Sequence, residues 1–256
     1  MTAIRPKVPV VSFTFDDFPR SALQTGGMIL AQYGARGTYY VSLGLMGKKL
    51  PAGAAFLSND LETVLSKGHE LGCHTFAHCH AWETPPDAFE HSIIENQQAL
   101  CKIIPGTFLK TLSYPIGFPR AATKRRASKY FDCCRCWGES FNFGATDANS
   151  LSAVFLEKHK DNYGKLDGLI DENSRVYGWL IFATHDVGPS PSQYGCTPHF
   201  FERIVRRAAA SGAKILPVSQ AWEFINNSPS SALTSDMRVP EGVKCEISHD
   251  SSDPAV

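Results

Sequence analysis

The sequence predicts an α/β fold in which parallel strands alternate with helices and close into a distorted (β/α) barrel of seven or eight units. Apolar, β-rich runs alternate with helical patterns through most of the 256 residues, and this alternation is typical of a parallel sheet. The first run, Val8–Phe15, is almost continuously apolar, as expected for a strand that is buried on both faces. Barrels of this kind often form one domain at this length.

The remaining units follow in order along the chain. Further strands are expected at Thr38–Leu43, Glu70–His74, Thr111–Tyr114, Phe131–Trp137, Ala153–Leu156, Tyr177–Thr184 and Lys214–Val218. Helices are expected at Ala22–Tyr33, Asn59–Lys67, Pro86–Ile104 and Thr197–Ala210. The last of these begins with Thr-Pro, a favourable N-cap and first-turn pair. Parallel strands joined through helices imply right-handed crossovers.

The composition changes near residue 227. We expect the barrel domain to occupy residues 1–226, and we expect 227–256, rich in serine and poor in apolar residues, to form a flexible or surface tail. The N-terminus has no basic segment followed by an apolar stretch of about 7–15 residues, so a cytoplasmic location is expected.

Charge and hydropathy exclude two classes of partner. The 25 basic and 25 acidic side chains give zero net charge, so a nucleic-acid partner is not expected. No apolar run reaches the roughly 18 residues of a membrane helix, so no membrane partner is expected. The oligomeric state has no signature in the sequence.

Polar residues gather where the predicted strands end. Asp16 and Asp17 close the first strand, His74 and His78 follow the third, and His185 follows the strand Tyr177–Thr184. Catalytic groups of a parallel barrel sit at the C-terminal ends of its strands. The i, i+4 spacing of the two histidines suits chelation of one ion. Two imidazoles and a carboxylate leave coordination positions open, while a second carboxylate and a distant histidine can move protons.

These motifs resemble the polysaccharide deacetylase family, carbohydrate esterase family 4. Thr14-Phe15-Asp16-Asp17 is similar to its first motif, and His74-Thr75-Phe76-Ala77-His78 to its second. Tyr114-Pro115-Ile116-Gly117 resembles the third, and Trp179–His185 resembles the fifth. The likeness runs in order from about Val10 to Phe224.

The resemblance implies a function and a role for each residue. Asp17, His74 and His78 would bind one divalent metal ion, usually zinc, with cobalt or nickel as alternatives. Asp16 would be the general base, His185 the general acid, and the main-chain N–H of Ile116 would help to hold the oxyanion. The substrate would be an acetylated oligosaccharide or glycan. Tyr114, Pro115 and Phe182 would contact it, although burial within a strand is the alternative for Phe182.

The chain also departs from the family pattern. The better-studied branch carries, at the position of Ser113, an arginine that orients the base, and this arginine is missing here. The fourth motif, an Asp-Trp, is not recognisable, and Asp147 is only a weak candidate for its aspartate.

Three functions are consistent with these residues. The first is an active saccharide deacetylase that cleaves N- or O-acetyl groups. The second is a non-catalytic saccharide-binding relative, and the third is a metal hydrolase of non-sugar C–N bonds. Retention of the base, the ligands and the acid favours the first.

Overall fold

The computed structural model describes residues 1–160 and 162–227 and confirms the predicted barrel. Seven parallel strands close into a ring because β11 pairs with both β10 and β2. In ring order they are β2 (Val10–Phe15), β3 (Thr38–Val41), β6 (Glu70–Cys73), β7 (Thr111–Ser113), β8 (Cys133–Gly138), β10 (Leu151–Phe155) and β11 (Trp179–Thr184). A short eighth strand, β12 (Lys214–Ile215), pairs with the N-terminal half of β2. Nearly all of the tail predicted at 227–256 lies outside the described residues.

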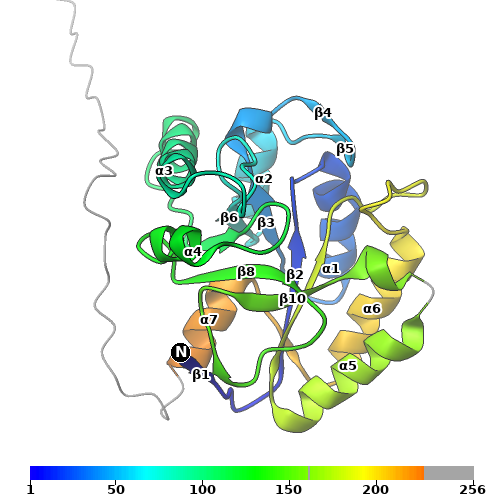
Figure 1. Cartoon of the computed structure of the whole chain (residues 1–256). Coiled ribbons are helices and arrows are strands. Elements are labelled where there is room, and N and C mark those ends of the chain that lie inside the picture. The colour runs from blue at the N-terminus through cyan, green and yellow to red at the C-terminus, as the bar shows by residue number, and fades with distance from the viewer. Residues whose placement is uncertain (161, 228–256) are drawn as a thin grey trace, which may run out of the picture.

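Helices cover the outside of this ring. They are α1 (Met28–Gln32), preceded by a π-helical turn at Ala22–Gly27, then α2 (Ser58–Ser66), α3 (Pro86–Ile103), α4 (Ala121–Ala127), α5 (Tyr163–Val176), α6 (Pro198–Ala210) and α7 (Val218–Asn226). Helix α6 packs between α1 and α5 along one flank, and α3 packs against α4 on another (Figure 1). Helices α4, α5 and α7 were not predicted from the sequence. No described helix combines the length and apolar character needed to cross a bilayer.

Alternate residues of each strand face two different cores. Outward-facing residues such as Phe13 and Phe182 pack against the helices in the larger core. Inward-facing residues such as Ile181 and Ala183 join a smaller core with Val218 and Ile225 of α7. This helix therefore closes the bottom of the barrel, which leaves the C-terminal ends of the strands as its open mouth.

Small elements complete the structure. Strand β1 (Thr2–Ile4) pairs antiparallel with β9 (Gly144–Thr146), and β4 (Lys49–Leu50) pairs with β5 (Gly53–Ala54). Single 3₁₀ turns cover Leu43–Leu45 and Leu156–His159.

Candidate functional site

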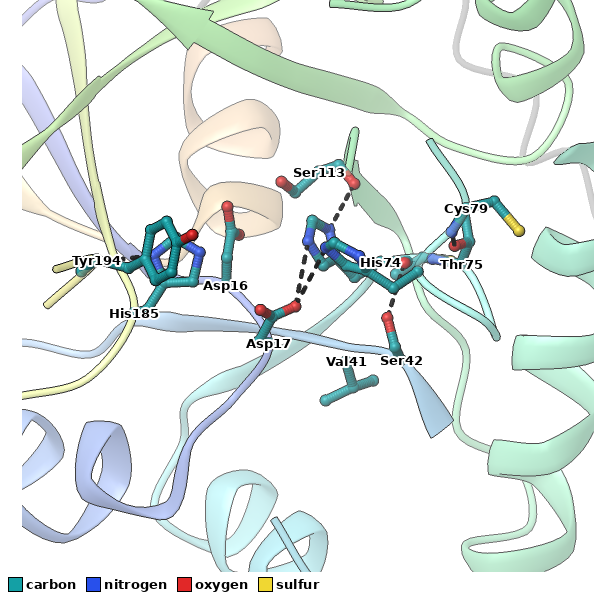
Figure 2. Close-up of polar contacts among 12 residues, drawn as sticks. Asp16, Asp17, Val41, Ser42, His74, Thr75, Cys79, Ser113, His185 and Tyr194 are labelled. Atoms are coloured by element: carbon teal, nitrogen blue, oxygen red, sulfur yellow. Dashed lines mark hydrogen bonds and ion pairs between the residues drawn. The ribbon is translucent and has the colours of Figure 1, made fainter. Parts of the chain in front are cut away.

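The mouth of the barrel brings together the two aspartates and three histidines singled out in the sequence. Asp16 and Asp17 follow β2, His74 and His78 follow β6, and His185 follows β11. Figure 2 shows Asp16 lying between His185 and His74, with Asp17 reaching toward the imidazole of His74. The structure therefore collects on one rim residues that are as far as 169 positions apart in the chain.

Asp17, His74 and His78 form a cluster that could hold a metal ion. Asp17 Oδ1 lies 3.7 Å from His74 Nε2 and 3.4 Å from His78 Nε2. The three candidate ligand atoms all lie within 4.8 Å of one another. Asp17 Oδ1 is buried and accepts no hydrogen bond from the described residues. A cation between the three atoms would supply the missing partner, so this donor set fits a divalent metal.

The protonation state of His74 suits metal binding. Its Nδ1 lies 2.8 Å from the main-chain oxygen of Ser113, so Nδ1 carries the proton and the lone pair of Nε2 faces Asp17. Burial lowers the pKa of His74 to about 4, because desolvation disfavours the charged imidazolium. His74 is therefore neutral at physiological pH, as a metal-ligating imidazole must be.

Left-handed backbone conformations are concentrated at this site. Asp17, Thr75, His78 and Ile116 have φ values of 60°, 58°, 53° and 57°. Such values are uncommon for residues other than glycine, and they cluster at functional sites where the surrounding structure imposes them. Backbone conformations that cost free energy are therefore found at Asp17 and His78, two of the candidate ligands, and at Ile116, the residue expected to hold the oxyanion.

Asp16 is paired with Arg135, a residue that was not predicted from the sequence to lie in the site. Arg135 of β8 donates a hydrogen bond from Nη2 to Asp16 Oδ1, and only 1% of Arg135 and 4% of Asp16 are exposed. Burial alone would raise the pKa of Asp16. The guanidinium of Arg135, with smaller contributions from His74 and His185, nevertheless holds that pKa below its ordinary value.

Aromatic rings flank the guanidinium. The Cζ atom of Arg135 lies 4.7 Å from the ring centroid of Tyr40 and 5.6 Å from that of Phe155, distances at which cation–π attraction operates. Arg135 is also the direct β-sheet partner of Ser113 on β7. The family arginine is missing at Ser113, but Arg135 on the neighbouring strand contacts Asp16 from the adjacent position in the sheet. The sequence does contain one sign of this pairing, since Arg135 is a charged residue within the apolar run Phe131–Trp137. An arginine is almost never fully buried without a partner.

A main-chain carbonyl orients His185. The backbone N–H of His185 donates to the oxygen of Tyr194 at 3.3 Å, and His185 Nδ1 lies 3.2 Å from the same oxygen. This contact places the proton on Nδ1 and leaves Nε2 free toward the mouth. Asp147, the weak candidate for the aspartate of the fourth motif, accepts a hydrogen bond from Lys124.

The loop that carries Tyr194 is tightly held. Asp186 accepts hydrogen bonds from the backbone N–H and the Oγ of Ser192, at 2.7 and 2.6 Å. A side chain at Gly195 would bring its Cβ within 2.3 Å of Asp186 Oδ1, so the close approach of the loop requires glycine. The carbonyl that contacts His185 therefore belongs to a rigid turn.

The three residues expected to contact substrate lie within the packing of the protein. Phe182 is fully buried and stacks on Phe13 with ring centroids 5.5 Å apart, which is the strand burial considered as its alternative. Tyr114 is 3% exposed and packs in the outer core, and Pro115 is also buried. Ile116, by contrast, is 61% exposed. Tyr114 and Pro115 thus anchor the loop that presents Ile116, and in this structure they have almost no surface to offer a ligand.

The fold and the site together define a parallel (β/α) barrel with a candidate metal centre and an ionised carboxylate at its mouth. Residues 3–131 match the polysaccharide deacetylase family, and the chain belongs to this family. A relative described as gellan lyase, from Bacillus sp., is 28% identical over 207 residues. That match covers 73% of this chain but only 8% of the length of the relative.

Solved structures share the fold. A family 4 carbohydrate esterase from Streptomyces lividans in complex with acetate aligns over 80% of this chain and 90% of its own, with 19% identity and a TM-score of 0.55. A T48 deacetylase with substrate aligns over 84% and 92%, with 18% identity and a TM-score of 0.57. A family 4 pseudoenzyme from Bacillus anthracis aligns over 85% and 66%, with 10% identity and a TM-score of 0.55. At these identities the likeness shows the fold alone.

Proposed function

We propose that this protein is a metal-dependent hydrolase that removes acetyl groups from a saccharide. The observation that carries the proposal is the pairing, at one mouth, of an Asp–His–His cluster with a separate carboxylate whose pKa is held below its ordinary value. The cluster can hold a divalent ion while the second carboxylate stays ionised and free to accept a proton. Membership of the polysaccharide deacetylase family supports an acetylated saccharide as the substrate.

Each residue at the mouth then has a distinct task. Asp17, His74 and His78 hold the ion, for which zinc is our first expectation and cobalt or nickel the alternatives. When bound, the ion supplies Lewis acidity to the attacking water and to the acetyl carbonyl. Asp16 accepts a proton from the attacking water.

The remaining steps concern the oxyanion and the leaving group. The main-chain N–H of Ile116 donates to the oxyanion that forms at the carbonyl carbon. His185, in its imidazolium form with a proton on each ring nitrogen, then donates the Nε2 proton to the departing sugar nitrogen or oxygen and returns to the neutral form protonated on Nδ1. The contact from Tyr194 to Nδ1 fixes the imidazole in the orientation that this proton transfer requires.

Acetate release tests the proposal directly. The purified protein, stripped of metal with a chelator and then reloaded with zinc, cobalt or nickel, is assayed against acetylated chito-oligosaccharides and acetylated xylo-oligosaccharides. We expect release that is lost on chelation and restored by metal, and that falls about 10²–10⁴-fold in Asp16→Asn. Saccharide binding without any acetate release from the metal-loaded protein would identify the non-catalytic relative instead. Release from small non-sugar amides alone would identify the third function.

A further inference from the structure

Phe155 adjoins two groups of the candidate site at once. It is the last residue of β10, and it faces the barrel interior together with Leu151 and Ala153 of the same strand. The centroid of its ring lies 5.6 Å from Arg135 Cζ and 6.1 Å from the ring centroid of His185. One phenyl ring is therefore the neighbour both of the arginine that pairs with the proposed base and of the proposed acid.

The register of the sheet sets the height of Phe155 in the barrel. Its sheet partner on β11 is Ala183, which precedes His185 by two residues. Two residues of strand span about 6.6 Å, so the backbone of Phe155 lies about that far below the level of His185. The ring is carried by a paired strand rather than by a loop, and side chains on such elements are held in position more precisely.

Asp16 faces the same two neighbours of Phe155. It accepts a hydrogen bond from Arg135, and its charge also interacts with that of His185 when the imidazole is protonated. Two positively charged groups can thus stand beside one buried carboxylate. The phenyl ring has no polar atom that could compete with Asp16 for hydrogen bonds from either group.

The chemistry of an aromatic ring suits this position. The face of the ring carries partial negative charge, so it attracts a cation about 6 Å away, whereas an aliphatic side chain of similar size does not. Arg135 is permanently charged. His185 must carry a charge before it can donate its Nε2 proton, because the neutral form keeps its only ring proton on Nδ1, beside the Tyr194 carbonyl. The ring therefore favours the charge state that each of its two neighbours needs.

We propose that Phe155 is a positioning residue whose ring stabilises both the guanidinium of Arg135 and the imidazolium form of His185. This inference rests on the proposed deacetylase function, because His185 needs its imidazolium form only if it acts as the general acid. Phe155 acts through these two residues and does not touch the substrate. Its ring thus connects the base side and the acid side of the reaction.

A fluorination series at Phe155 tests this inference. The residue is replaced by mono-, di- and trifluorinated phenylalanine, which withdraw charge from the ring face with little change in size, and by leucine. Acetate release from the acetylated saccharide is compared with cleavage of an activated aryl acetate, whose leaving group needs no protonation. We expect kcat on the saccharide to fall with each fluorine and to be about 2- to 30-fold lower in Phe155→Leu, the range of one cation–π contact. KM should stay near the wild-type value, and aryl acetate cleavage should fall less because it does not depend on His185.

Phe141 provides a matched control. It is also partly buried, but it packs beside Gly178, just before the N-terminal end of β11 and away from the mouth. The same replacements at Phe141 should leave both rates unchanged. Equal rates across the fluorinated series, with a loss only in Phe155→Leu, would show that the ring acts through its volume and would overturn the inference while leaving the deacetylase function intact. A loss confined to KM would make Phe155 a substrate contact and would also overturn it.

A double-mutant cycle tests the contact between Phe155 and Arg135 without any catalysis. It is run in the Asp16→Asn background, where loss of Arg135 leaves no unpaired buried carboxylate. Urea denaturation should show that Phe155→Leu destabilises the protein more when Arg135 is present than when it is replaced by methionine. Equal losses would overturn the inference whatever the catalytic result. If the wild type releases no acetate, the proposed function fails and the role of Phe155 toward His185 fails with it, while the cycle still decides its role toward Arg135.

Discussion

Replacing Arg135 should affect stability and catalysis together, because Arg135 is the arginine that pairs with the buried carboxylate of Asp16. In Arg135→Met, Asp16 remains almost fully buried with its charge uncompensated. Breaking a buried ion pair by removing one partner costs about 3–5 kcal/mol of folding free energy. We therefore expect a loss of this size in the free energy of unfolding, measured by urea denaturation at pH 7.

Removing the second charge should recover much of this loss. In the double variant Arg135→Met/Asp16→Asn no charge is left buried and unpaired, so the double variant should be more stable than Arg135→Met alone. Asp16→Asn completes the double-mutant cycle. Strictly additive losses of unfolding free energy would show that Arg135 and Asp16 have no coupling energy, which would contradict a stabilising pairing of their charges.

Catalysis gives the second measurement for the same residue. Arg135→Lys keeps a charge but loses the planar fork that fixes a carboxylate in orientation, so acetate release should fall while metal content stays at the wild-type level. Because Ser113 and Arg135 are sheet partners, Ser113→Arg/Arg135→Ser should recover part of the activity lost in Arg135→Ser. Wild-type rates in both Arg135→Lys and Arg135→Met would refute a positioning role.

Three further predictions follow from the site and its surroundings. His78→Ala and Asp17→Asn should each lose bound metal by elemental analysis, whereas Asp16→Asn should keep it, and equal loss in all three would contradict the division of roles. His185→Ala should abolish cleavage of an acetamide substrate but leave measurable cleavage of an activated aryl acetate, whose leaving group needs no protonation; an equal fall on both substrates would exclude His185 as the acid. His69 accepts a hydrogen bond from the Gly37 N–H, and burial lowers its pKa to about 4, so the unfolded chain takes up protons first as pH falls below about 6.5. Between pH 6.5 and 5 the wild type should lose about 1–2 kcal/mol more stability than His69→Asn, which keeps an acceptor without titrating, and parallel pH profiles in urea denaturation would contradict this.

Much of the barrel could be predicted from the sequence because its strands are short, apolar and separated by helical patterns. Strands such as Val10–Phe15 and Trp179–Thr184 lie within the ranges expected for them. Helices α5 and α7 were missed because their buried faces are short and are interrupted by polar residues such as Asn173 and Ser219. Their positions are fixed by tertiary packing, which carries more of a helix's stability than intrinsic propensity does.

The parts of the site that the sequence could not reveal depend on contacts between distant segments. The pairing of Arg135 with Asp16 depends on the register of β8 against β7, which no local pattern encodes. The contact to His185 comes from the main-chain oxygen of Tyr194, and a carbonyl has no residue-type signature. The burial of Phe182 follows from which face of β11 turns toward the helices, and a one-residue difference in alternation reverses that choice.

The Arg135–Asp16 pair also bears on whether this chain is an active enzyme. The fold alone leaves the question open, because a family 4 pseudoenzyme shares it. A buried ion pair contributes little net stability, and apolar residues of similar volume often serve as well or better. Packing the barrel interior therefore gives no reason to place a guanidinium between Tyr40 and Phe155. A carboxylate that must stay ionised within a buried site does give such a reason, because burial raises the pKa of Asp16 and the guanidinium of Arg135 lowers it. The arginine is thus consistent with the proposed role of Asp16 as a general base, and it favours the active deacetylase over the non-catalytic relative among the proposed functions.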